Sequence, residues 1–133
     1  MLALKTEQFA TFEKNFAEGS KSSLITNLEF KVNTIQKQLS VLATFMFEQE
    51  KKTFIKIQVS CHFGVANESW DNLCNEAKIT FSKEFLAHLA MLTVGSTRGV
   101  LHAKTENTKL NQFLLPTINV TSLVKNDIEF SLK

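Results

Sequence analysis

The chain has 133 residues, which is the size of one domain, and its 44% hydrophobic and 21% charged residues are typical of a globular protein. The net charge is only +2 and the longest basic run is Lys51-Lys52, which argues against a nucleic-acid-binding protein. No segment approaches the roughly 20 apolar residues of a membrane span, and the N-terminus lacks the apolar stretch of a signal peptide. We therefore expect a single cytoplasmic domain, residues 1–133.

The N-terminal segment, residues 2–16, fits two structures. Its phenylalanines recur at helical spacing, whereas Leu2 and Leu4 alternate as in a strand. The pattern by itself slightly favours a helix. The polar segment that follows, residues 17–23, is predicted to be a loop.

Three strand patterns come next, joined by short polar turns. Residues 27–34 alternate between apolar and polar, and residues 54–65 do the same. Residues 39–49 are apolar at both parities, which is typical of a strand covered on both faces. Together they predict an antiparallel meander. Cys61 and Cys74, which lack metal-ligand spacing, are interpreted as reduced thiols rather than a disulfide.

From Ser82 the apolar spacing changes to three and four residues, which predicts one long helix over residues 82–106 with Ser82 as its N-cap. Gly95 and Gly99 lie on one stripe of this helix. Each glycine costs about 1 kcal/mol relative to alanine inside a helix. A close approach by the sheet or by a second copy of the helix is the expected compensation.

The only proline, Pro116, lies between two apolar runs near the end of the chain. Proline cannot sit within a helix and it biases the preceding residue toward extended backbone. Residues 110–118 are therefore predicted to form an extended connection. A short final helix is expected from Ser122 to about Lys133, capped by Thr121 or Asn119.

The three histidines do not form an evident metal site. His62 falls on the polar face of a strand, while His88 and His102 lie on a similar face of the long helix, about 21 Å apart by helical rise. They cannot share a metal within one chain. We expect structural or surface roles for all three.

Two further motifs are weak signs of catalysis. The sequence Gly95-Ser-Thr-Arg-Gly99 faintly resembles a phosphate loop, but it lies inside a helical pattern, where helix packing is the simpler explanation. The acidic residues around Trp70 could act as an acid and a base; without a visible partner of opposite role, they are predicted to lie in a solvated loop. These residues are Glu68, Asp71 and Glu76. The chain is therefore predicted not to be an enzyme, and to need no cofactor or metal.

The apolar content exceeds what one small sheet and one helix need. "LEFKV", "FLLP" and "INVTSLV" carry most of the surplus. These residues either belong to the core or form a surface that binds apolar segments or another subunit.

The predicted layout resembles the SecB family of export chaperones. The segments "ITNLEFKVNTIQKQ" and "FIKIQVSCHFGVAN" resemble two of its strands. The most recognisable part is an arginine in the long helix followed by an apolar loop ending in Pro-x-[Ile/Val]-Asn, which here is Arg98 and then Leu114 to Asn119. The resemblance covers about residues 2–124. It implies an α+β fold with a four-stranded antiparallel sheet, one long helix and a short C-terminal helix, and it moves residues 2–16 from helix to strand.

The resemblance also implies a function. SecB-like proteins are ATP-independent holdases, usually dimers of dimers, that hold non-native polypeptides in apolar surface grooves. Carried over by position, the oligomer interface contains Gly95, Arg98 and Gly99. The groove-lining face of the second strand, the crossover loop and the inner face of the terminal helix are Leu28, Phe30, Val32, Phe113, Leu114, Leu115, Ile118, Val120, Leu123 and Val124.

Typical SecB is strongly acidic, whereas this chain is slightly basic, so the resemblance is to a divergent member, such as those found beside toxin–antitoxin systems or as orphans. The implied partners are non-native polypeptides together with the translocase SecA or an antitoxin, and the implied assembly is a homodimer or homotetramer. Two other interpretations of the function stay open. One is a small α+β domain that encloses an apolar ligand, and the other is a structural oligomerisation domain.

Overall fold

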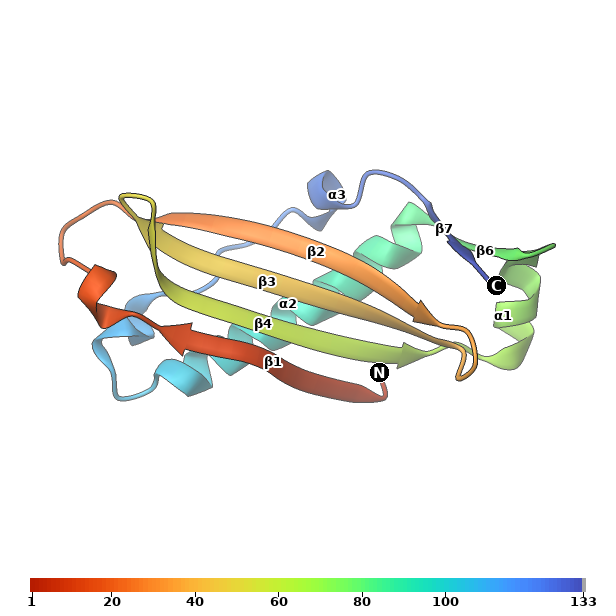
Figure 1. The fold of residues 1–133 in the computed structure, drawn as a ribbon, viewed down its shortest axis with the longest axis horizontal. Coiled ribbons are helices and arrows are strands. Elements are labelled where there is room, and N and C mark those ends of the chain that lie inside the picture. Colours follow the sequence, from red (N-terminus) through yellow and green to blue (C-terminus); the bar gives the residue numbers. More distant parts are fainter. Residues whose placement is uncertain (133) are drawn as a thin grey trace.

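The computed structural model describes residues 1–132 and shows an α+β fold built on a long antiparallel sheet. The strand order in this sheet is β1-β4-β3-β2, so β1 and β2 are its two edges. The long helix α2 (Lys83–Thr105) crosses one face of the sheet (Figure 1). The four strands are β1 (Ala3–Thr11), β2 (Ser23–Asn33), β3 (Gln38–Gln49) and β4 (Lys52–Gly64).

A second, smaller sheet lies at the end of the molecule where α2 begins (Figure 1). Its strand order is β5-β6-β7, with all neighbours antiparallel. The helix α1 (Asn67–Leu73) connects it to the large sheet. The three short strands are β5 (Cys74–Asn75), β6 (Lys78–Phe81) and β7 (Ile128–Ser131).

The core lies between the large sheet and α2. The residues of β3 and β4 that face the helix alternate with residues of the opposite face, as the strand period requires; those opposite residues are polar in β4 and include Leu42 and Met46 in β3. The helix contributes the stripe opposite, including Leu86, Val94 and Leu101. The sheet side of this core consists of Leu39, Val41, Ala43, Phe45, Phe47, Ile55, Ile57, Val59, Cys61 and Phe63, all buried.

Hydrogen bonds fix the start of α2 and satisfy the buried hydroxyls along it. The Ser82 hydroxyl accepts from the Phe85 amide at 3.2 Å, as the sequence predicted for an N-cap. The Asp127 carboxylate accepts from the Lys83 amide at 2.8 Å, which places a negative charge at the positive end of the helix. Farther along, the buried hydroxyls of Thr93, Thr97 and Thr105 each donate to the carbonyl four residues earlier.

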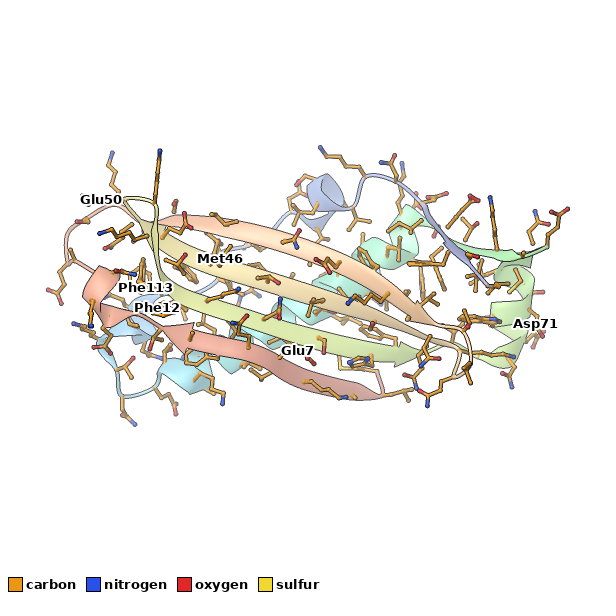
Figure 2. The ribbon with its side chains drawn as sticks, in the orientation of Figure 1. Glu7, Phe12, Met46, Glu50, Asp71 and Phe113 are labelled. Atoms are coloured by element: carbon orange, nitrogen blue, oxygen red, sulfur yellow. The ribbon has the colours of Figure 1, made fainter. Side chains whose placement is uncertain are left out.

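The other face of the large sheet is mostly polar, with Ile25, Leu42 and Met46 as apolar exceptions. Figure 2 shows Glu7 and Met46 over this face, on the side away from α2. The Ser60 hydroxyl donates to Glu7 at 2.8 Å, and the Gln58 amide donates to the Thr44 hydroxyl at 2.9 Å. Such cross-strand pairs satisfy the polar groups that stay partly buried between neighbouring strands.

The N-terminal segment is a strand, not the helix that its pattern slightly favoured. β1 pairs with β4, and its register shifts between Thr6 and Gln8. This bulge lets Leu4 and Phe9, five residues apart, both face the side of the sheet that packs against α2. The bulge therefore explains why apolar and polar residues do not alternate regularly along this segment.

The solvated loop predicted around Trp70 is wrong. Residues Asn67–Leu73 form α1, and Trp70 is buried with its ring 6.4 Å from that of Phe81. Glu68 and Asp71 are exposed on the outer side of this helix. The tryptophan anchors α1 on β6, a strand that the sequence reading had not identified.

The final helix predicted from Ser122 onward is also wrong beyond Leu123. α3 (Val120–Leu123) is a single turn with Asn119 at its N-cap position, where the Asn119 side chain accepts no capping hydrogen bond, and residues Ile128–Ser131 form β7 against β6. Phe130 packs edge-on against Phe81 at 5.9 Å, which favours the strand over a solvated helix. Lys133, the predicted end of that helix, lies outside the described residues.

Two predictions from composition can be compared with the structure. Cys61 and Cys74 are free thiols, Cys61 buried in the core and Cys74 half-buried. Among the helices of residues 1–132, none combines the length and the apolarity needed to cross a bilayer.

Candidate functional site

The segment between α2 and β7 passes behind the large sheet and reaches the β2 edge, where α3 lies (Figure 1). We call residues 113–124 the crossover. A short 3-10 turn, Lys109–Gln112, precedes it, so the extended connection predicted for 110–118 begins at Phe113. Residues 113–119 then have no helical or strand assignment, as Pro116 requires.

Arg98 holds the crossover against α2. Its Nε donates to the carbonyl of Leu115 at 3.1 Å, and its Nη2 donates to the carbonyl of Pro116 at 3.0 Å. The planar guanidinium suits this double contact because its donors are fixed in a fork. The resemblance placed Arg98 at a subunit interface; in the structure its side chain is instead used within the chain.

Neighbouring crossover side chains point to opposite environments. Leu114 is 56% exposed while Leu115 is 3% exposed. Leu123 is 43% exposed, whereas Val120 and Val124 are buried. Leu115, Val120 and Val124 are thus core residues and cannot line an open groove in this conformation, contrary to the expectation from the resemblance.

Three predicted groove residues of β2 lie on the side of the sheet that faces α2. Leu28, Phe30 and Val32 pair with Ala43, Val41 and Leu39 of β3, and all three stay half-buried because β2 is an edge strand. In the part of the chain that the structure describes, residues 1–132, no strand lies beside the outer edge of β2. The apolar margin is the name used below for these residues together with the accessible part of the crossover: Leu28, Phe30, Val32, Leu114, Ile118 and Leu123.

Phe113 begins the crossover inside a cluster of four phenylalanine rings. Its centroid lies 4.9 Å from that of Phe54, 5.4 Å from Phe16 and 5.7 Å from Phe47. The half-buried Phe113 therefore belongs to the packing at this end of the sheet, near the exposed Phe12 in Figure 2. It fastens the start of the crossover rather than presenting its ring to solvent.

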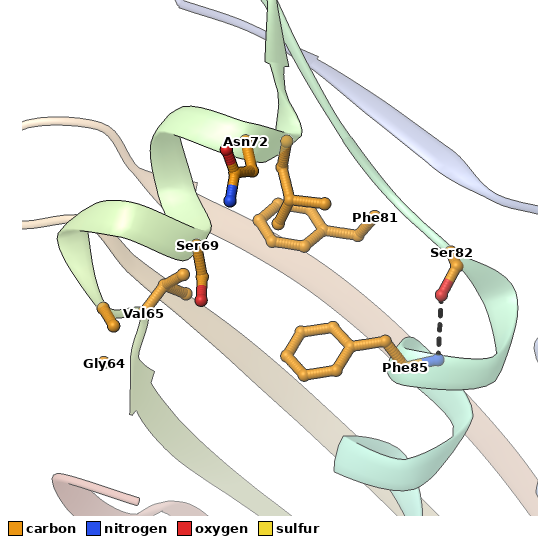
Figure 3. Close-up of a pocket in the computed structure, with 9 residues that line it drawn as sticks. Gly64, Val65, Ser69, Asn72, Phe81, Ser82 and Phe85 are labelled. Carbon is orange, nitrogen blue, oxygen red and sulfur yellow. Dashed lines mark hydrogen bonds between the residues drawn. The ribbon is translucent and has the colours of Figure 1, made fainter.

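A second feature is an open apolar cavity of about 580 Å³ between α1 and the start of α2 (Figure 3). The rings of Phe81 and Phe85 stack at 6.0 Å beside it. The sequence reading had not found this cavity, and the only available signal was the helical spacing of Trp70 and Leu73. Its lining is Gly64, Val65, Ala66, Ser69, Asn72, Leu73, Phe81, Ser82 and Phe85.

Gly95 and Gly99 lie on the exposed side of α2, away from the sheet. A Cβ atom added at either position would meet nothing within 4 Å. The sheet therefore does not supply the close approach predicted for these glycines. The other partner expected from the sequence, a second copy of the helix, stays a prediction.

The titratable residues singled out from the sequence are dispersed. His62 contacts the Ser60 hydroxyl at 3.1 Å on the polar sheet face, and His88 and His102 are exposed on α2. Within residues 1–132, no three histidine, cysteine or acidic side chains of one chain converge as a metal site would require.

The Arg98 contacts lead to a first prediction. We expect Arg98→Ala to lower the free energy of unfolding by only about 1–2 kcal/mol, because water can reach part of the two carbonyls that lose their donor. In the same variant the hydrogen-bonded amides of Phe113 and Val124, at the two ends of the crossover, should exchange faster, which hydrogen-exchange mass spectrometry measures. Arg98→Lys is the matched control for charge, since an ammonium cannot reproduce the fork. Unchanged exchange in Arg98→Ala would show that Arg98 does not hold the crossover.

Comparisons with known proteins give no relative: no family model matches the chain, and no curated protein or solved structure matches it.

Proposed function

We propose that the protein is an ATP-independent holdase that binds non-native polypeptides along the apolar margin. The observation that carries the proposal is the position of that margin. Within residues 1–132, half-buried apolar side chains line an edge strand whose outer side pairs with no other strand, and exposed crossover residues such as Leu114, at 56% exposure, add apolar surface.

Two physical effects suit this surface to unrelated clients. An edge strand offers a row of backbone donors and acceptors to any extended segment, whatever its side chains. Apolar burial contributes about 25 cal/mol per Å² and has no directional requirement. Many moderate contacts of this kind hold a chain without selecting one sequence.

The crossover contributes exposed apolar surface to the proposed site and is held in an extended conformation. Pro116 and the two Arg98 hydrogen bonds keep it extended, so Leu114 stays presented while Leu115 anchors the segment in the core. A preordered surface loses less conformational entropy when a client binds. In this proposal Pro116 keeps the crossover extended, so that one apolar residue is exposed to clients and its neighbour is packed in the core.

The proposal extends to assembly and partners, following the resemblance to SecB. The protein works as a homodimer or homotetramer in the cytoplasm, with the exposed side of α2 around Gly95 and Gly99 as the contact between copies. Its clients are precursors for export, delivered to SecA, or an antitoxin that it protects. Open space above both glycines is the feature that supports a contact through this helix.

Light scattering tests the proposal. An aggregation-prone unfolded protein is diluted into buffer with and without a stoichiometric amount of this chain, in the absence of ATP. We expect the chain to suppress the scattering, and we expect the double variant Leu114→Ser/Leu123→Ser to lose most of this effect while keeping its circular dichroism spectrum.

The matched control is Ile25→Ser/Ile35→Ser. It also removes two exposed aliphatic side chains, but these lie outside the apolar margin. Ile25 is 41% exposed on the sheet face away from α2, and Ile35 is 92% exposed at the turn between β2 and β3. This control should suppress scattering as the wild type does. Equal loss in both variants would mean that the effect is non-specific, and no suppression by the wild type would remove general holdase activity.

A second candidate function is suggested by the cavity beside Phe81 and Phe85. Its volume of about 580 Å³ is in the range of small-ligand sites, and its lining is mostly apolar. Phe85→Ala would then reduce binding of an apolar probe dye without changing scattering. If the holdase proposal is correct, the scattering depends on the crossover leucines instead.

A further inference from the structure

The exposed side of α2 carries charged residues whose order is the same from either end. With Gly95 as the midpoint, His88 and His102 lie seven residues away on either side, and Glu84 and Glu106 lie eleven residues away. At about 100° per residue, all four project within roughly 20° of the direction of Gly95. All five positions are exposed.

Such a stripe maps onto itself, with like residues facing each other, when two helices pack antiparallel about a two-fold axis through Gly95. Each residue then meets the one that lies equally far on the other side of the midpoint in the partner. Met91, 60% exposed, would face the partner's Gly99, where open space surrounds the missing side chain. A large side chain opposite a glycine is the arrangement that lets two helices approach closely.

The same symmetry brings the histidines together across the pair. His88 of one copy faces His102 of the other, and Glu84 faces Glu106. In the single chain His102 Nε2 already lies 3.7 Å from Glu106 Oε1, so the imidazole and the carboxylate project together. Two facing carboxylates repel each other unless a cation lies between them. Imidazole and carboxylate groups are ligands that divalent zinc accepts.

We propose that a second copy of this chain packs antiparallel on this stripe, and that each end of the pair binds a divalent transition metal such as zinc through Glu84 and His88 of one copy and His102 and Glu106 of the other. The inference rests on the assembly proposed above and adds its register and a ligand. It needs the pair, because His88 and His102 of one chain are about 21 Å apart and, within residues 1–132, one chain provides no metal cluster.

Sedimentation equilibrium of the full chain, with zinc chloride or with a chelator, tests the site. We expect zinc to lower the dimer dissociation constant about tenfold or more, because the metal binds only the dimer. His88→Ala and His102→Ala should each abolish this response, since every site takes one histidine from each copy. His62→Ala, on the sheet face away from α2, is the matched control and should respond as the wild type.

Mixing the two variants makes the test specific to an intersubunit site. A heterodimer of His88→Ala with His102→Ala loses both histidines from one end and keeps both at the other, so the mixture should regain part of the zinc response. Retention of the full response in His88→Ala, or no recovery in the mixture, would overturn the proposed site. A dimer indifferent to zinc would refute the metal but leave the assembly, and a monomer under all conditions would refute both.

Discussion

The Phe54→Ala variant is expected to lose about 3–5 kcal/mol of unfolding free energy, the usual cost of truncating a buried phenylalanine. Phe54 is fully buried, and its ring centroid lies 4.9–6.3 Å from those of Phe16, Phe47 and Phe113. These three rings come from the segment after β1, from β3 and from the crossover. One truncation therefore loosens three parts of the chain together.

Urea denaturation followed by circular dichroism measures this loss. Phe12→Ala is the matched control, because Phe12 is the same residue type near the same end of the sheet but is 48% exposed (Figure 2). It should cost less than about 1.5 kcal/mol, since nearly half of its surface is already exposed to water. If Phe54→Ala cost no more than Phe12→Ala, the phenylalanine cluster would not be a centre of stability.

The second large effect separates two adjacent crossover residues. We expect Leu115→Ala to cost about 2–5 kcal/mol of unfolding free energy, because Leu115 is 3% exposed and the truncation leaves a cavity. Leu114→Ala should change stability by only about 0.5 kcal/mol, because Leu114 is 56% exposed. Its loss should instead appear in the light-scattering assay.

We therefore expect the two variants to differ in opposite ways when both denaturation and light scattering are measured. Leu115→Ala should lose stability and, below its unfolding midpoint, still suppress aggregation. Leu114→Ala should keep its stability and suppress aggregation less well. Equal stability of the two variants would contradict the burial in the structure, whereas unchanged suppression in Leu114→Ala would contradict its place in the apolar margin.

The local pattern of apolar and polar residues was sufficient to predict the elements that bury one regular face. The alternation in β2 and β4, the apolar run of β3 and the change of period at Ser82 predicted three strands and the long helix, and the structure confirms them. The proline predicted a non-helical segment, which is found from Phe113 onward. These features depend on residues a few positions apart, so the sequence carries them directly.

The errors arose where a distant partner decides the structure. Residues after Leu123 were predicted to be helical, yet they form β7 because β6 offers a free edge and Phe81 a ring for Phe130 to pack on. The bulge in β1 and the register shift after Phe47 change which side chains face inward, including Phe54. Neither irregularity has a local sequence signal.

The candidate site divides in the same way. The sequence by itself determined that the crossover is apolar and extended, and that Gly95 and Gly99 share a helix face with His88 and His102, since helical period and proline geometry are local properties. Only the tertiary structure decided that Leu115 is core while Leu114 is exposed, and that Arg98 holds the segment. Burial depends on which surfaces meet, and those surfaces come from parts of the chain far apart in sequence.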